Sequence, residues 1–139
     1  MAQGAAANGE IVGAFALDVR PNGDNRIEFK RASRYLCRLR IANPTGQRHA
    51  YKIKSSSNEM LLMAPVMGTV PAHEHVEATL RFRRPAEHQH EEDWTPRDDE
   101  HHYSVSHIPA PENASARGVW AVHDGSAVGL RRIRCRFMP

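Results

Sequence analysis

The chain has 139 residues, of which 40% are hydrophobic and 25% are charged, and its formal net charge is +3. This length suits one domain with a real core. The sequence has no apolar run long enough for a transmembrane helix, no start typical of a signal peptide and only two cysteines. We therefore expect a cytoplasmic protein in which Cys37 and Cys135 are buried free thiols rather than a disulfide framework.

In chain order, a flexible lead-in is expected over residues 1–13, where Gly, Ala and Asn dominate, followed by one domain over residues 14–139. Short runs of alternating apolar and polar residues predict strands at 15–20, 26–30, 34–42, 48–55, 60–64, 75–82, 102–108 and 130–137. Residues 67–74 are predicted to form a turn region, and residues 114–122 one or two helical turns around Trp120. Short strands separated by turn signals favour an all-β sandwich.

Alternation also predicts which side chains of these strands face solvent. A strand that buries Tyr51 and Ile53 must direct Lys52 and Lys54 outward. The same rule turns three side chains of the last two strands outward, namely His102, Ser104 and Arg132.

An acidic, His-rich loop is expected at residues 86–101. Its segment 87–100 holds seven of the sixteen acidic side chains and one arginine, which leaves eighteen basic and nine acidic side chains on the rest of the chain. Such a basic body attracts anionic partners, and we expect the acidic loop to oppose this attraction by screening or gating the basic face. Four histidines in or beside the loop are donors that zinc or nickel accepts: His88, His90, His101 and His102. A flexible loop must lose entropy to gather such ligands, so we expect a solvated loop, no metal site and no cofactor.

Catalytic and nucleic-acid signatures are weak. The sequence lacks a Gly-x-Ser-x-Gly elbow and a Walker motif, so it predicts no enzyme and no catalytic residue. Arginines alternate along 34–42 and 130–137, as a protein following a phosphate backbone would need. The aromatic residues Tyr35, Tyr51, Phe82 and Tyr103 are predicted to be buried and cannot stack on bases, so we expect no nucleic-acid binding. Because the chain has no long apolar run, we also expect no direct membrane insertion.

Several blocks of the chain resemble one known domain. Residues 39–82 contain a leucine-rich strand running into Asn-Pro-Thr, then aromatic-Lys-x-Lys with hydroxyls, a short strand ending in proline, and a glycine-containing turn before an alternating strand. The later blocks "HHYSVSHIPAP", "VW" and "RIRCRFMP" continue the pattern. Over about residues 15–139 the chain resembles the major sperm protein (MSP) domain of nematode sperm proteins and VAMP-associated proteins. The resemblance implies a seven-stranded immunoglobulin-like sandwich.

The resemblance also implies a function. In VAMP-associated proteins this domain binds acidic peptides with two aromatic residues, called FFAT motifs, on a basic face. Carried over by position, the peptide-binding residues are Lys52, Lys54, Ser55, Ser56, His102, Ser104 and Arg132. Because the family has a lysine and a methionine where this chain has His102 and Ser104, we expect weaker binding of a standard FFAT peptide or preference for another one. The alternative is a structural, cytoskeletal protein that self-assembles, as nematode sperm proteins imply.

Overall fold

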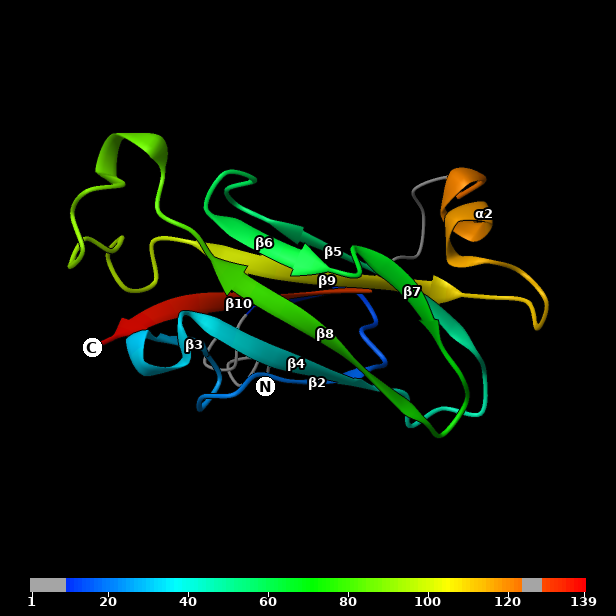
Figure 1. Ribbon diagram of the computed structural model, residues 1–139. Helices are drawn as coiled ribbons and strands as arrows, with labels where there is room; N and C mark the ends of the chain where they lie inside the picture. Colours follow the sequence, from blue (N-terminus) through cyan, green and yellow to red (C-terminus); the bar gives the residue numbers. More distant parts are fainter. Residues whose placement is uncertain (1–9, 124–128) are drawn as a thin grey trace.

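The computed structural model of the protein describes residues 10–123 and 129–139 (Figure 1). Its strands are β1 (Glu10–Val12), β2 (Asp18–Arg20), β3 (Ile27–Lys30), β4 (Leu36–Ala42), β5 (His49–Ser55), β6 (Leu61–Ala64), β7 (Met67–Val70), β8 (His75–Phe82), β9 (His102–Pro109) and β10 (Gly129–Met138). The helical segments are the short 3-10 turns η1 (Arg31–Ser33) and η2 (Ala86–His88) and the helix α2 (Ala116–Ala121). In the part of the chain that the structure describes, no helix is long and apolar enough to cross a membrane.

The strands form two sheets that pack face to face (Figure 1). The larger sheet has the order β1-β10-β9-β5-β7, and β3 pairs in parallel with the last residues of β10. The smaller sheet has the order β2-β4-β8-β6 and is antiparallel throughout. This arrangement confirms the predicted all-β immunoglobulin-like sandwich, although the strands are more numerous than the seven expected.

The core lies between the sheets and follows the predicted alternation. The largest side chains with almost no exposed surface are Tyr103, Phe29, Ile27, Leu39, Ile41, Leu61, Leu80 and Ile133. Both cysteines are buried free thiols, as predicted. Burial raises the pKa of Cys37 to about 12 and also raises that of Cys135. Both thiols are therefore protonated and packed like small apolar groups.

The predicted turn at residues 67–74 is partly wrong, because Met67–Val70 is strand β7, paired with β5. The glycine that suggested a turn has a packing role. A Cβ added to Gly68 would lie 2.6 Å from the Tyr51 hydroxyl and 2.9 Å from its ring. Gly68 therefore makes room for the Tyr51 side chain inside a strand.

The N-terminal prediction differs in its last part. Residues 1–9 of the predicted lead-in lie outside the described residues. Residues 10–12 form β1, which pairs antiparallel with β10. The edge of β10 offers unpaired backbone groups, and hydrogen bonding to them makes residues 10–12 a strand although their composition predicts no regular structure.

Candidate functional site

A row of basic and hydroxyl side chains crosses the outer face of β5, β9 and β10. Backbone pairing sets Lys54 opposite Ser104, and Ser104 opposite Arg132. Because adjacent strands lie about 5 Å apart, this row places the lysine and the arginine on either side of the serine, about 10 Å from each other along the sheet. We call this surface the basic face; it consists of Lys52, Lys54, Ser56, His102, Ser104, Ser106, Arg132 and Arg134.

Two further rows flank the first. Lys52 lies opposite Ser106, and His102 lies opposite Arg134. The three strands themselves contain no Asp or Glu. The next strand, β1, brings Glu10 opposite Arg132 in the register. The basic face therefore concentrates cations and hydroxyl donors over three strands that contain no acidic residue.

Helix α2 closes one end of the basic face. The helix begins at Ser115, whose hydroxyl accepts a hydrogen bond of 3.0 Å from the amide of Gly118. It packs on a small apolar cluster formed by Ala50, Ile108, Ala110, Ala116, Val119 and Trp120. The indole of Trp120 donates a hydrogen bond of 3.3 Å to the carbonyl of Tyr51, and its ring centroid lies 5.0 Å from the ammonium of Lys52. This cation–π contact holds Lys52 against an aromatic wall.

The opposite end of the face is tied together by Ser56. Its amide donates to the carbonyl of His102 at 3.0 Å, and its hydroxyl accepts from the amide of His102 at 3.0 Å. The same hydroxyl lies 3.0 Å from Nδ1 of His101. A serine–histidine contact alone is not a catalytic dyad, because a further group must orient the imidazole. The contacts instead fix the end of β9 beside the end of β5.

Ser55 does not join the basic face. It continues the inward phase of Tyr51 and Ile53, and its hydroxyl donates to the carbonyls of Ser57 and Leu61 at 3.0 and 3.1 Å. Those bonds shape the turn between β5 and β6. The structure therefore directs the Ser55 hydroxyl into this turn rather than onto the basic face, although Lys54 and Ser56 are its neighbours in the chain.

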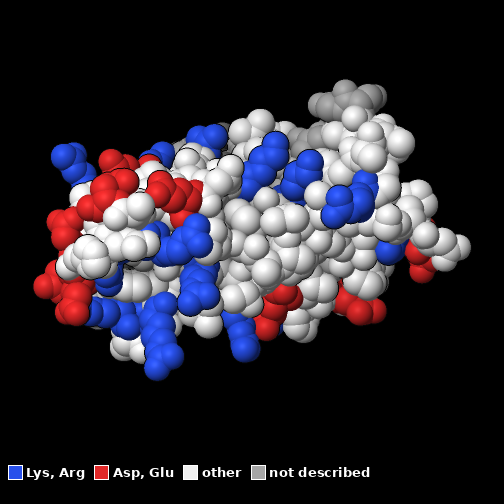
Figure 2. All heavy atoms as spheres, turned by 45° about the horizontal axis from the view of Figure 1, so that its top comes forward, with Lys and Arg blue, Asp and Glu red and all other residues white. Residues whose placement is uncertain are grey.

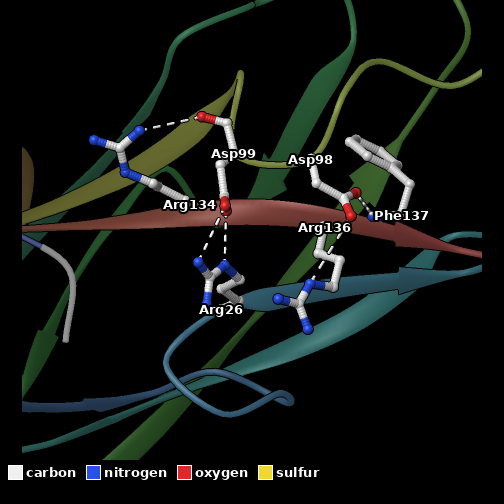
Figure 3. Close-up of polar contacts among 6 residues, drawn as sticks. All are labelled: Arg26, Asp98, Asp99, Arg134, Arg136 and Phe137. Carbon is white, nitrogen blue, oxygen red and sulfur yellow. Dashed lines mark hydrogen bonds and ion pairs between the residues drawn. The ribbon is translucent and has the colours of Figure 1, made fainter. Parts of the chain in front are cut away.

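The acidic loop lies at the end of the sandwich away from α2 (Figure 1), and acidic side chains gather at that end in Figure 2. Its carboxylates bind arginines outside the lysine-bearing rows (Figure 3). Asp99 accepts two bonds from Arg26, at 2.7 and 3.0 Å, and Asp98 lies 4.0 Å from Arg136. The bond from Arg26 is the main reason why the pKa of Asp99 is lowered.

Backbone contacts also hold the loop in place. Asp98 accepts the amide of Phe137 at 2.8 Å, and the carbonyl of Asp99 accepts from Arg134 at 3.2 Å (Figure 3). Trp94 packs against the main core and stacks on His88, with ring centroids 4.0 Å apart. The loop is therefore attached more firmly than the predicted solvated segment. The loop bonds to the basic face through Arg134 and through the contact between Ser56 and His101.

The loop histidines serve separate local contacts. His88 pairs with Glu91, whereas His101 contacts Ser56. Within residues 10–123 and 129–139, no group of three or more His, Cys, Asp and Glu side chains is arranged to hold a metal ion.

Alternation thus found most of the basic face but missed some of its parts. Ser106 and Arg134 continue the outward phase of residues already singled out, so the same pattern could have included them. Trp120 gave no such signal, because its position depends on where α2 packs.

Comparisons with known proteins agree with this architecture. The chain matches the family described as the MSP (Major sperm protein) domain over residues 16–121. No curated protein sequence matches it. A structurally similar protein is WR4, a Caenorhabditis elegans MSP family member, with a TM-score of 0.58 and 18% identity over 89% of this chain and 97% of that chain.

Two further solved structures share the fold. The MSP-domain-like protein SSP-19 from Caenorhabditis elegans has a TM-score of 0.55 and 18% identity, covering 72% of this chain and 84% of that chain. The ASH/PapD-like domain 7 of human CEP192 has a TM-score of 0.54 and 11% identity, covering 88% of this chain and 83% of that chain. At these identities the structural matches establish the fold alone. Together with the family match over most of the chain, they show that the protein belongs to the MSP domain family.

Proposed function

We propose that this domain is a non-enzymatic, cytoplasmic interaction module that binds short acidic, FFAT-like peptides on the basic face. Members of the MSP family are binding or structural modules without enzymatic activity. The observation that carries the proposal is the single row of Lys54, Ser104 and Arg132 across three strands. Carboxylates of an extended peptide can form charge-assisted hydrogen bonds with such a row.

The aromatic part of the ligand has a candidate contact in Trp120. Its ring stands beside Lys52 at the border of the basic face. An aromatic side chain next to an acidic residue would contact this ring while its neighbour pairs with the lysine. The ligand class that fits is therefore a peptide that combines acidic and aromatic residues.

The acidic loop does not oppose this ligand at the lysines. Its carboxylates pair with arginines of the η1, β3 and β10 regions, including Arg26 with Asp99 and Arg31 with Asp93. These internal pairs satisfy negative charge that would otherwise compete with a peptide for Lys52 and Lys54. The loop thus leaves the lysine end of the basic face to an external ligand.

A charge-reversal pair tests the site. Binding of a fluorescent acidic peptide with two phenylalanines is measured by anisotropy for the wild type and for Lys52→Asp/Lys54→Asp. The matched control is Arg38→Asp/Arg40→Asp, which makes the same change in net charge at the same spacing on β4, where both arginines are exposed. We expect the lysine variant to weaken binding about tenfold or more and the control to change it less than about threefold.

Equal weakening by both variants would mean that the peptide responds only to net charge. Absence of binding by the wild type at high peptide concentration would refute the proposal. Restoring the family's residues gives the converse test. His102→Lys adds a permanent charge and Ser104→Met an apolar contact, so each is expected to tighten binding of a standard FFAT peptide.

A further inference from the structure

The turn into β4 holds its backbone in an unusual conformation. Arg34 and Tyr35 are consecutive and have φ angles of 55° and 57°, in the left-handed region that large side chains rarely adopt. Two hydrogen bonds hold Tyr35 there, because its amide donates to the carbonyl of Lys30 at 2.9 Å and its carbonyl accepts from the amide of Phe82 at 3.0 Å. Strained residues that the surrounding structure maintains in this way are concentrated at functional sites.

Tyr35 lines a hollow of about 290 Å³ at the end of the smaller sheet. Phe82 lies beside it, edge to face, with ring centroids 5.3 Å apart. The volume lies just below the range of about 300–1,000 Å³ that small-molecule pockets occupy, so the hollow suits one side chain of a partner better than a larger ligand. The other lining residues are Arg83, Arg84, Gln89 and His90.

Two arginines give this hollow its positive charge. Within the described part of the chain, the only hydrogen bond of the Arg83 guanidinium joins Nη2 to the carbonyl of Glu59 at 3.2 Å, which leaves Nε and Nη1 for a ligand. The Arg84 guanidinium instead donates to the carbonyls of Gln89 and Glu92, at 3.4 and 3.0 Å, and so fixes the wall that the acidic loop provides. Arg83 therefore offers donors beside a second, fixed positive charge.

No carboxylate belongs to the described residues that line the hollow. His90 does line it, is exposed, and adds a further positive charge when it is protonated. An anion in the hollow would therefore meet cationic donors before it met the negative charge of the acidic loop. Three neighbouring carboxylates each have another partner, namely Glu59 with the amide of Ala86, Glu91 with His88, and Asp93 with Arg31.

We propose that this hollow binds the phosphorylated side chain of a tyrosine from a partner protein. The phosphate carries a charge of about −1.5 to −2 at pH 7 and has three acceptor oxygens, which match the donors of Arg83 and His90 and the charge of Arg84. The phenyl ring would pack against Tyr35 and Phe82. An unmodified tyrosine would lack the charge, and a phosphoserine would lack the ring.

The hollow is separate from the basic face. Tyr35 precedes β4 and Arg83 follows β8, and both strands belong to the smaller sheet, whereas the basic face lies on β5, β9 and β10 of the larger sheet (Figure 1). The assignment therefore does not rest on the proposed peptide binding.

NMR titration of the full-length, nitrogen-15-labelled protein tests the site. The probe is N-acetyl-phosphotyrosine amide, and the controls are N-acetyl-tyrosine amide, which has no phosphate, and N-acetyl-phosphoserine amide, which has no ring. We expect the probe to shift the Nε–H signal of Arg83 and the amides of Tyr35 and His90, with an affinity about tenfold or more above that of either control. Arg83→Gln should remove this preference, whereas Arg38→Gln, the same change at an exposed position of β4, should preserve it.

Equal affinity for the tyrosine derivative would overturn recognition of the phosphate, and equal affinity for the phosphoserine derivative would overturn the role of the ring. Absence of shifts at Tyr35, Arg83 and His90, or larger shifts on the basic face, would overturn the site. If Arg83→Gln does not fold, the wild-type comparison of the three compounds decides alone. Failure of peptide binding on the basic face would not affect these outcomes.

Discussion

A buried pair of histidines predicts that the stability of this domain falls on acidification. His107 and His49 are 4% and 6% exposed, and their Nδ1 atoms lie 3.1 Å apart. Nε2 of His107 accepts a hydrogen bond of 2.9 Å from the amide of Ala16. Since Nε2 is an acceptor, the proton of neutral His107 resides on Nδ1 and is donated to His49. A second proton on His107 would face the Ala16 amide and break this chain of bonds.

The size of the effect follows from the shift in pKa. Burial, with a smaller contribution from the nearby His49, lowers the pKa of His107 from 6.5 to about 4. Between these pH values the unfolded chain binds a proton that the folded chain does not bind, so folding becomes less favourable as pH falls. This shift corresponds to about 3 kcal/mol lost by pH 4, with a slope of at most about 1.4 kcal/mol per pH unit. The pKa of His49 is lowered as well, which acts in the same direction.

Urea denaturation at several pH values between 7.5 and 4 measures this loss. His107→Gln keeps an acceptor for the Ala16 amide but cannot be protonated in this range, so we expect a shallower dependence of the unfolding free energy on pH. His73→Gln, which changes an exposed histidine of the turn before β8, should retain the wild-type slope. The reasoning would be refuted if His107→Gln and the wild type lost stability equally over this range.

Three further expectations concern packing, charge and assembly. Gly68→Ala should lower the urea-unfolding free energy by about 1–3 kcal/mol, because its Cβ would overlap the Tyr51 side chain; an unchanged midpoint would contradict this packing. Asp99→Asn should lower the free energy of unfolding by about 0.5–1 kcal/mol at pH 7, because the ion pair of Asp99 with Arg26 is partly solvated. The control Glu112→Gln, at an exposed position, should lower it by less. Equal losses in the two variants would contradict a stabilising role for the ion pair. If docking rather than self-assembly is the function, sedimentation equilibrium should give a monomer at high concentration, and concentration-dependent growth would favour the structural alternative.

The sequence predicted the sheets well because their core residues alternate strictly. Cys37, Leu39 and Ile41 are buried on β4 between exposed Arg38 and Arg40, as the period of two required. Strand β7 was missed because a glycine needed for packing has the same local signature as one needed for a turn. Local patterns cannot distinguish the two without the partner side chain.

Only two features of the sequence predicted the candidate site: the alternation of apolar and polar residues, and the family resemblance. Alternation gave the outward direction of Lys52 and Lys54, but the cross-strand register that sets Lys54 beside Ser104 is a tertiary property. Ser55 was carried over from the resemblance as a peptide-binding residue, but in the structure its hydroxyl bonds to the carbonyls of Ser57 and Leu61 in the turn after β5. The contact of Trp120 with Lys52 depends on how a short helix packs, which no period in the sequence encodes.

Mapping the peptide contact by NMR tests the central claim most directly. The nitrogen-15-labelled domain is titrated with the acidic, phenylalanine-containing peptide, and amide shifts are followed on both sheets. The account predicts that the largest shifts fall on Lys52, Lys54, Ser104 and Arg132 together with the indole N–H of Trp120. Largest shifts on β4 and β8 of the smaller sheet, or no shifts at a saturating peptide concentration, would contradict it.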